Sequence, residues 1–383
     1  MFKDATLLPA LSCNASCDFC GLDRKTRRGE MGREPLKRVL KYLKKYGTEH
    51  VCVSGGEPLQ DRYVPILTDG LRASGIGERA EVTIKTNGKC ASSRRKAERI
   101  AKRLKAAGVS LVEISLDTFH ARHIPVDYVA NLARACEKNG IPYNIGARSF
   151  RSTYRDDIDL VEQFAGKVGR RVNLVIRKDP WIRGADTVAY WLSLDSCKII
   201  KSCESVRYGM GKPKDLPGSS MDDIYNNNRV IVHERAQALV GDSRETISEE
   251  DDILGRPKRT TFRRAFRKVQ GRRGCKGIVP TFMPDGRIIP CCSWEMLNSC
   301  REASLGRYPE TDLEALEQEL DSYPFSGLPN RDWEGVFRFT QDHAPGLLDE
   351  PLIRVYRPFL NRLYHMCGFC AEAHKVYARN RRN

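Results

Sequence analysis

The sequence predicts an α/β protein in which repeated βα units form a parallel sheet and a smaller α+β unit follows. Residues 1–180 alternate short apolar runs with amphipathic stretches at spacings of about 30 residues, which is typical of βα units. Farther along the chain, Asp285-Gly286 lies between two apolar runs and predicts a β-hairpin. These two observations define the fold class.

Apolar runs are expected to form the strands, and the stretches between them the helices. The helix expected after the first strand shows the pattern clearly, because Leu36, Val39, Leu40 and Leu43 fall on one face. In such an arrangement functional side chains gather where the strands end, at the carboxyl edge of the sheet. The expected strands are residues 5–12, 50–54, 80–85, 110–115, 142–147 and 172–177.

The chain is expected to divide into residues 1–180 with the βα units, a divergent segment at 181–274 in the substrate region, and a small domain at 275–383. The divergent segment ends in a basic arm, residues 256–268, in which Phe262 and Phe266 alternate with cations. On a helix these rings would be neighbours and would dock on the core, while the cations face water. The alternative is an arm that grips phosphates and stacks bases.

Composition and charge restrict the class of protein. The chain has 383 residues, 14 Cys and a formal net charge of +16. It has neither a signal-peptide pattern nor an apolar stretch of ~20 residues, so we expect a cytoplasmic protein without a membrane span, whose grouped cysteines bind metal. The charge favours nucleic acid, phosphorylated metabolites or an acidic peptide as partners; the alternative is a basic surface kept for solubility.

Cys13, Cys17 and Cys20 lie on one tight loop directly after the first expected strand. Three thiolates on one loop can hold three irons of a [4Fe–4S] cluster and leave the fourth iron open for chemistry. A structural zinc site is the alternative, but zinc sites usually pair two Cys-x2-Cys units and no second unit lies nearby. Two other cysteines, Cys52 and Cys136, fall in apolar patterns and are expected in the core.

The spacing Cys-x3-Cys-x2-Cys, with the aromatic Phe19 before the last cysteine, resembles the signature of the radical S-adenosylmethionine (radical SAM) superfamily. The resemblance implies an open, partial (β/α)6 barrel and a [4Fe–4S] cluster on the three cysteines that binds SAM. Two turns resemble further motifs of that family, namely Gly55-Gly56-Glu57-Pro58 after the second strand and Thr86-Asn87-Gly88 after the third.

The resemblance also implies which residues contact SAM. The turn formed by Gly55, Gly56, Glu57 and Pro58 would meet the amino group of the methionine part, with the Asn87 turn beside it. Ser115, at the end of the fourth strand, matches a serine directed at the ribose or the carboxylate. Arg148 matches an arginine directed at the carboxylate, with which a guanidinium can form a bidentate pair. For Arg148 a surface salt bridge is the alternative.

A second group of cysteines lies in the C-terminal part. Cys275 and Cys291 flank the expected hairpin, and Cys367 and Cys370 form a later Cys-x2-Cys unit. Four thiolates saturate a cluster. The pattern resembles the Twitch extension, the shorter form of the SPASM domain that follows radical SAM barrels, and implies one auxiliary [4Fe–4S] cluster. Cys292 is an alternative to Cys291, and an all-cysteine zinc site is an alternative to the cluster.

The resemblance implies a radical oxidoreductase. One electron from the SAM-binding cluster would cleave SAM to methionine and a 5′-deoxyadenosyl radical, which removes a hydrogen atom from the substrate. The auxiliary cluster would accept the electron left on the substrate, which gives a two-electron oxidation; a redox-neutral outcome such as epimerisation is the alternative.

The expected partners are a reductant such as flavodoxin or ferredoxin and a substrate that is a peptide, a protein side chain or an acidic small molecule. The first strand begins near residue 5, so we expect no N-terminal peptide-recognition domain, which favours a small molecule. Nucleic acid is an alternative substrate. An alternative of another class is a non-catalytic protein that binds nucleic acid through the basic arm.

Overall fold

The computed structural model describes residues 3–17, 20, 29–149, 154–169, 172–178, 188–194, 279–291, 297, 303–321, 334–349 and 366–380. Phe19, Cys275, Cys292 and the basic arm 256–268 lie outside these residues. For Arg148 and Cys367 only the backbone is described.

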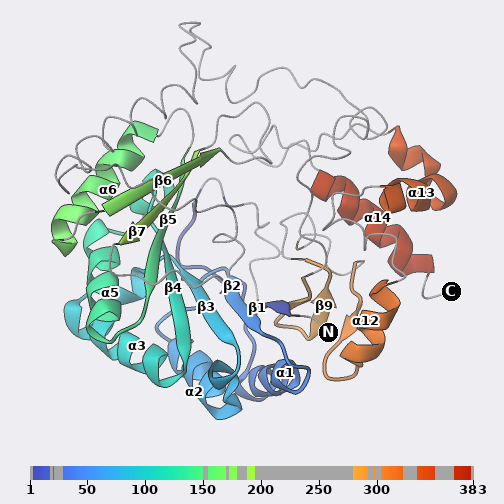
Figure 1. Cartoon of the computed structure of the whole chain (residues 1–383), viewed down its shortest axis with the longest axis horizontal. Helices are drawn as coiled ribbons and strands as arrows, with labels where there is room; N and C mark the ends of the chain where they lie inside the picture. Colours follow the sequence, from blue (N-terminus) through green and yellow to red (C-terminus); the bar gives the residue numbers. More distant parts are fainter. Residues whose placement is uncertain are drawn as a thin grey trace, which may run out of the picture.

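The described strands form one mixed sheet with an open parallel part, as expected for a partial barrel (Figure 1). In the parallel part each strand pairs with the one that follows it in the sequence. The first five expected strands are thereby confirmed. They are β1 (Asp4–Ala10), β2 (His50–Gly55), β3 (Glu81–Thr86), β4 (Val109–Ser115) and β5 (Tyr143–Ser149).

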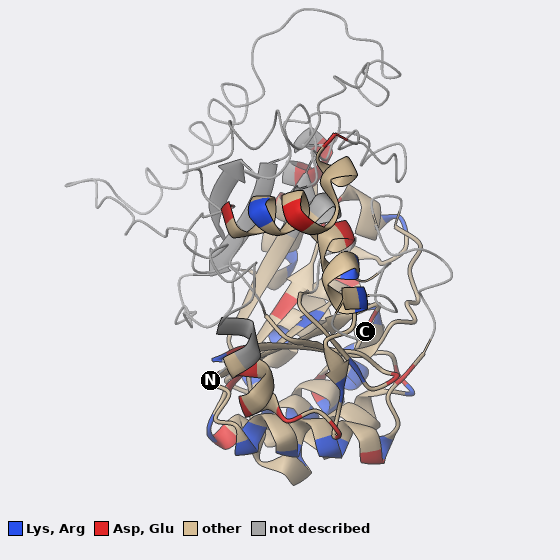
Figure 2. Ribbon diagram, turned by 90° about the vertical axis from the view of Figure 1, so that its right-hand side faces the viewer, with Lys and Arg blue, Asp and Glu red and all other residues tan. Residues whose placement is uncertain are grey.

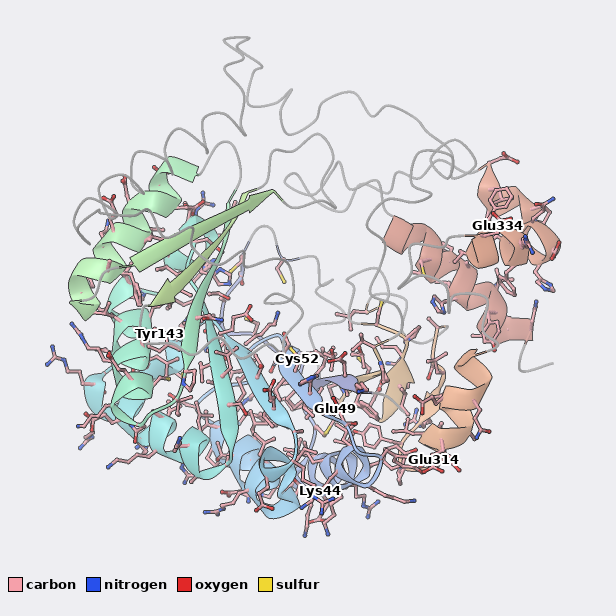
Figure 3. All side chains as sticks on the ribbon, viewed as in Figure 1. Lys44, Glu49, Cys52, Tyr143, Glu314 and Glu334 are labelled. Carbon is pink, nitrogen blue, oxygen red and sulfur yellow. The ribbon has the colours of Figure 1, made fainter. Side chains whose placement is uncertain are left out.

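Amphipathic helices cover the outer side of this sheet (Figure 1). The first, α1 (Arg33–Lys45), buries the four aliphatic residues that the pattern predicts, while its Lys44 points away from the sheet (Figure 3). The other helices of this part are α2 (Val64–Ser74), η1 (Ile76–Glu78), η2 (Lys89–Ala91), α3 (Arg94–Ala106), α4 (Thr118–Ala121), α5 (Val126–Lys138) and α6 (Tyr154–Val168).

The two cysteines expected in the core differ. Cys136 on α5 is fully buried, as expected. Cys52 on β2 is only half-buried, because Val51 and Val53 beside it take the face that packs under the helices and Cys52 faces the other side of the sheet (Figure 3). The expectation of a core position for Cys52 is therefore wrong.

The far edge of the sheet departs from the expected barrel. A strand forms at the sixth expected run, β6 (Val172–Lys178), but β7 (Val188–Leu194) lies between it and β5 and runs antiparallel to both. The six expected strands all run in the same direction, and the departure from the expected pattern is that β7 separates the sixth from the fifth. A run of β-branched and aromatic residues predicts that a segment forms a strand. Which strands it pairs with depends on tertiary contacts that the local sequence does not show.

The hairpin expected around Asp285-Gly286 is present, with Gly286 at a φ of 88°. Its strands are β8 (Thr281–Phe282) and β9 (Arg287–Ile289), and β10 (Gly306–Arg307) pairs antiparallel with β9. β8 also pairs in parallel with β1, so the hairpin extends the sheet of the N-terminal part. The remaining helices are α12 (Leu313–Asp321), α13 (Glu334–His343), η4 (Pro345–Leu348) and α14 (Met366–Asn380).

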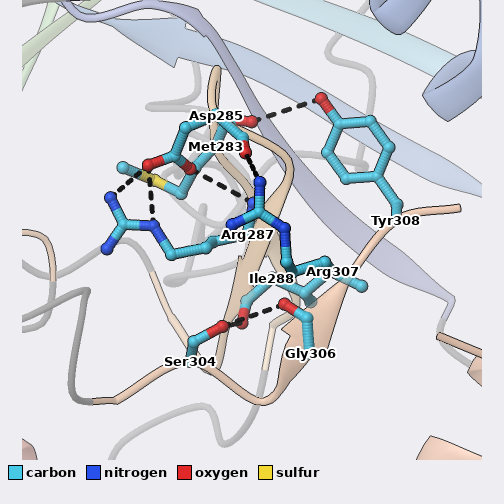
Figure 4. A network of polar contacts seen from close by, with 8 residues as sticks. All are labelled: Met283, Asp285, Arg287, Ile288, Ser304, Gly306, Arg307 and Tyr308. Carbon is cyan, nitrogen blue, oxygen red and sulfur yellow. Dashed lines mark hydrogen bonds and ion pairs between the residues drawn. The ribbon is translucent and has the colours of Figure 1, made fainter. Parts of the chain in front are cut away.

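Polar side chains fasten the hairpin to the chain that follows it (Figure 4). The Arg307 guanidinium donates to the Asp285 carbonyl oxygen at 2.6 Å, and the Tyr308 hydroxyl donates to the Met283 carbonyl oxygen at 3.3 Å. The Asp285 carboxylate also pairs with Arg287, which holds its pKa below the usual range despite partial burial. The hairpin is thus a fixed part of the sheet edge.

Lys and Arg recur along the outer helices, where blue segments interrupt the tan ribbon (Figure 2). Asp69 on α2 has three arginines around it, Arg33 at 3.3 Å, Arg72 at 3.4 Å and Arg103 at 3.6 Å. One carboxylate therefore interacts with cations from three helices, α1, α2 and α3. Among the helices that the structure describes, none combines the length and apolar character needed to cross a bilayer.

Candidate functional site

The cysteine loop leaves the carboxyl end of β1 and is held against the turn that follows β2. The Gly56 N–H donates to the Ala10 carbonyl and the Glu57 N–H to the Ser12 carbonyl, both at 2.9 Å. The Gln60 amide donates to the Ser12 carbonyl at 2.9 Å and to the Ser12 hydroxyl at 2.8 Å. These bonds fix the chain directly before Cys13.

Gly55 and Gly56 are required by the close approach of these two segments. A Cβ atom on Gly55 would lie 2.2 Å from the Ala10 carbonyl oxygen, and one on Gly56 would lie 2.2 Å from the Ser12 carbonyl oxygen. Gly55 also has a φ of +128°, which L side chains rarely adopt. The segment that approaches the backbone of this turn is the cysteine loop itself.

The Cys13 sulfur faces hydrogen-bond donors. The Ala15 N–H lies 3.4 Å from it and the Asn87 side-chain amide 3.8 Å. Burial raises the pKa of the Cys13 thiol to about 11, against the opposing effect of the Ala15 N–H. Cys17 is buried and Cys20 half-buried, and the Cys20 N–H donates to the Cys17 carbonyl at 3.1 Å.

Glu57 is turned into the protein and organises the turn after β3. Its carboxylate accepts from the Thr86 hydroxyl at 2.7 Å, the Asn87 N–H at 2.7 Å and the Leu59 N–H at 2.8 Å, and the residue is 1% exposed. Burial raises the pKa of this carboxyl above its ordinary value, while the hydrogen bonds act in the opposite direction. The side chain therefore connects the turns after β2 and β3, and only the backbone of its own turn is left to face a ligand.

Asn87 and Lys89 tie the turn after β3 to the cysteine loop. The Asn87 amide donates to the Asn14 side-chain oxygen at 2.9 Å, and the Lys89 ammonium donates to the Asn14 carbonyl at 2.7 Å. Gly88, between them, has a positive φ of 76°, which glycine adopts without strain. Asn87 thus lies at the cysteine loop, as its strand-end position predicts.

Ser115 and Arg148 lie on neighbouring strands near the carboxyl edge. Ser115 is the last residue of β4, half-buried, and pairs in register with Gly146 of β5, two residues before Arg148. The Arg148 backbone pairs with Ala189 of β7. The strand ends bring these two positions to the same edge as the cysteine loop.

A residue that the sequence analysis did not single out, His120, also reaches the cysteine loop. Its ring nitrogen Nδ1 lies 2.8 Å from an Asp117 carboxylate oxygen, and Cys17 is close enough to affect the pKa of the ring. Burial alone would lower the pKa of His120, but Asp117 and Cys17 raise it to about 10. The Asp-x2-His sequence after β4 marks a helix start, and nothing local in it indicates the proximity to Cys17.

The three cysteines of the loop are donors of the type that an iron–sulfur cluster takes. Within the part of the chain that the structure describes, no three His, Cys, Asp or Glu side chains converge on one point that could hold an ion. A cubane cluster asks for a different arrangement, because each thiolate binds its own iron and the sulfurs stand apart. The described loop offers three thiols, and two N–H groups are directed at the sulfur of Cys13.

The second cysteine group is described only in part. Cys291 follows β9 and is half-buried, while Cys370, on α14, is 9% exposed. Cys20 and Cys291 pack against one apolar cluster, which joins β1, the hairpin and α14. Its members are Leu8, Leu11, Met283, Ile289, Leu297, Ala303 and Ala371. The structure thus brings Cys291 to the neighbourhood of the first cysteine loop.

Comparison with known proteins gives a consistent match for the first part of the chain. Residues 7–174 match the radical SAM superfamily. A GTP 3′,8-cyclase of Pelotomaculum thermopropionicum is 35% identical over 130 residues, which are 33% of this chain and 38% of that protein. A GTP 3′,8-cyclase of Mycobacterium sp. (strain KMS) is 32% identical over 159 residues, 38% of this chain and 43% of that protein. The matches thus span less than half the length of these curated relatives.

Solved structures align over more of the chain at low identity. Native anSMEcpe with bound AdoMet and the Kp18Cys peptide aligns with 98% of this chain and 97% of its own, at 16% identity and a TM-score of 0.46. SuiB of Streptococcus suis aligns with 85% of this chain and 67% of its own, at 18% identity and a TM-score of 0.42. At these scores the alignments carry no argument about activity.

Proposed function

Since residues 7–174 form a radical SAM domain, we propose that Cys13, Cys17 and Cys20 hold a [4Fe–4S] cluster at which the protein binds and reductively cleaves SAM. The cluster and SAM together supply a 5′-deoxyadenosyl radical, which removes a hydrogen atom from the substrate. The observation that carries the proposal is the cysteine loop at the carboxyl edge of β1, fastened to the turns after β2 and β3.

The residues of the chain bind the cluster and SAM and hold them in position. The three thiolates hold three irons, and the Ala15 and Asn87 N–H groups stabilise the charge on the Cys13 sulfur. The backbone of the turn from Gly55 to Pro58 binds the amino group of SAM, while the Glu57 carboxylate keeps that turn and the Asn87 turn together. Ser115 binds the ribose or the carboxylate of SAM, and Arg148 pairs with the carboxylate.

The C-terminal part, residues 275–383, supplies an auxiliary [4Fe–4S] cluster of the SPASM or Twitch type in this proposal. Its ligands are Cys275, Cys291, Cys367 and Cys370. The packing of Cys291 on the same apolar cluster as Cys20 supports a position close to the first site. A cluster there can take up the electron left on the substrate, so the proposed outcome is a two-electron oxidation, with redox-neutral epimerisation as the alternative.

For the substrate we propose an acidic small molecule, with a peptide side chain as the second candidate. The formal charge of +16 favours an anion. The curated relatives named GTP 3′,8-cyclase make a nucleoside triphosphate the first molecule to test.

An anaerobic assay on reconstituted protein tests the proposal. We expect about eight irons per chain for two clusters and 5′-deoxyadenosine formation from SAM under dithionite. Cys13→Ala should abolish cleavage, whereas Cys52→Ala, a thiol on the opposite side of β2 from the helices, should not. Zinc without cleavage would overturn the proposal. Stimulation of cleavage by GTP or by a short peptide then separates the two substrate classes.

A further inference from the structure

Helix α3 presents an almost entirely cationic surface to solvent. Every exposed residue of this helix is a Lys or an Arg, except Ala106. Its larger apolar residues, Ile100 and Leu104, lie on the opposite side and are buried in the core. The exposed cations are Arg94, Arg95, Arg99, Lys102, Arg103 and Lys105. The outer side of α3 therefore offers positive charge and almost no apolar contact.

Three of these cations form a row along the outer side of α3. Arg95, Arg99 and Lys102 are spaced by four and then three residues, so they share one side of the helix, about 6 and 4.5 Å apart along its axis. Neither Arg95 nor Arg99 forms an ion pair with a residue that the structure describes. The one acidic residue of the helix, Glu98, pairs with Lys138 of α5 at 2.8 Å. Within the described chain, no carboxylate pairs with the two arginines of this row.

Helix α1 adds a second set of cations, and α2 lies between the two helices (Figure 1). Arg38 and Lys41 of α1 are exposed and likewise form no ion pair with a described residue. Asp69 on α2 pairs with one arginine of each neighbour, at 3.3 Å on α1 and at 3.6 Å on α3, so the three helices are fastened together. We define the basic face as the set Arg38, Lys41, Arg95, Arg99 and Lys102.

The side chains around the basic face favour one class of anionic partner. Protein interfaces have an apolar and aromatic centre in which Lys is depleted, and membrane-bound helices insert large apolar side chains. The exposed apolar residues of α1 and α3 are only Pro35 and Ala106, and the aromatic Tyr42 of α1 is half-buried. Phosphate groups of nucleic acid require only cations, and a guanidinium can bind a phosphate through two hydrogen bonds.

We propose that the basic face binds the phosphate backbone of nucleic acid without recognising the base sequence. Base stacking needs exposed aromatic rings, which the outer sides of α1 and α3 do not have. The inference goes beyond the proposed function, because binding at this face requires neither a cluster nor SAM. The face lies on the outer side of the sheet (Figure 1), so nucleic acid bound there is a docking partner and not the molecule that reacts.

The experiment measures binding of the reconstituted full-length protein to a fluorescent DNA duplex of about 20 base pairs, between about 50 and 200 mM salt. Arg95→Gln/Arg99→Gln removes two cations from α3. The matched control, Arg338→Gln/Arg379→Gln, removes two exposed arginines from α13 and α14. Glutamine has nearly the same helix propensity as arginine, and circular dichroism shows whether each variant is folded.

We expect Arg95→Gln/Arg99→Gln to weaken binding by about 10- to 100-fold at about 100 mM salt and to reduce the slope of log K against log salt by about two. The control should change the affinity by less than about threefold. Arg38→Gln/Lys41→Gln should resemble the α3 variant, and it decides the question if the α3 variant does not fold. Wild-type affinity and slope in the folded variants would overturn the inference and assign binding to another part of the chain, such as residues 256–268.

Competition distinguishes nucleic acid from other anionic partners. A duplex of unrelated sequence should displace the labelled duplex as well as an unlabelled copy does. Polyglutamate and vesicles that contain phosphatidylserine should compete at least about tenfold less well, because a duplex carries one charge per about 1.7 Å of its axis. Equal competition by polyglutamate would indicate an acidic protein as the partner, and equal competition by vesicles a membrane. Either result, or a wild type that binds no duplex, would overturn the inference.

Discussion

Replacement of Gly56 by alanine offers the most direct test of how the cysteine loop is positioned. The added Cβ would lie 2.2 Å from the Ser12 carbonyl oxygen, whereas real Cβ contacts essentially never fall under 3.0 Å, so the two segments must separate by about 0.8 Å. That movement stretches the bonds from the Gly56 N–H to Ala10 and from the Glu57 N–H to Ser12, both 2.9 Å, beyond hydrogen-bond range. At about 0.5–1.5 kcal/mol each, their loss lowers the free energy of unfolding by about 1–3 kcal/mol.

The matched control is Gly166→Ala on α6. An added Cβ there meets nothing within 4 Å, and alanine favours a helix over glycine by about 0.5–1 kcal/mol. The same chemical change should therefore raise the urea midpoint of the iron-free protein at Gly166 and lower it at Gly56. Gly56→Ala should also reduce the iron bound after reconstitution. An unchanged midpoint and unchanged iron content in Gly56→Ala would refute the close approach described for this turn.

Three further outcomes are expected. In Glu57→Gln one buried N–H or O–H donor faces the new amide NH2 group, so the free energy of unfolding should fall by about 1–3 kcal/mol. The control Glu49→Gln affects only an exposed pair with Lys3 and should change the free energy of unfolding by less than about 1 kcal/mol. Equal effects of the two variants in urea unfolding would contradict the role of Glu57. Because the thiolate is the reactive form and burial raises the pKa of Cys13 to about 11, alkylation of Cys13 in the iron-free protein, followed by mass spectrometry, should keep accelerating up to about pH 11; a plateau near pH 9 would argue against this shift. Cys291→Ser should remove about four irons per chain and leave SAM cleavage detectable; full iron content would exclude Cys291 as an auxiliary ligand.

The parallel part of the fold could be predicted from the sequence because its strands are buried on one or both faces. Runs such as Glu81–Thr86 and Val109–Ser115 therefore stand out as short apolar segments with turn residues at their ends. The positions of the cysteine loop and of Asn87 follow from the same rule, since parallel strands end at one edge. Local sequence patterns were sufficient to place those residues whose location depends only on their position along a strand.

Contacts between distant segments could not be predicted. The apolar run Val188–Leu194 contains no information about the two strands between which it inserts. Similarly, His120 lies beyond β4 and comes near Cys17 only because the sheet brings the two loops together. Glu57 lies in a motif that resembles one of the radical SAM family. Its hydrogen-bond partners on the neighbouring turn could not be predicted, because they come together only in the folded chain.

The pairing of β8 with β1 has a consequence for the order of folding. The Thr6 N–H donates to the Pro280 carbonyl at 3.0 Å, and Thr6 lies opposite Thr281 in the parallel ladder. Such a contact closes a very long loop, so it forms late and slows folding. Until it forms, the strand that leads into the cysteine loop presents an open edge, which is a template for intermolecular pairing. Fragments that end before the hairpin should therefore aggregate through β1.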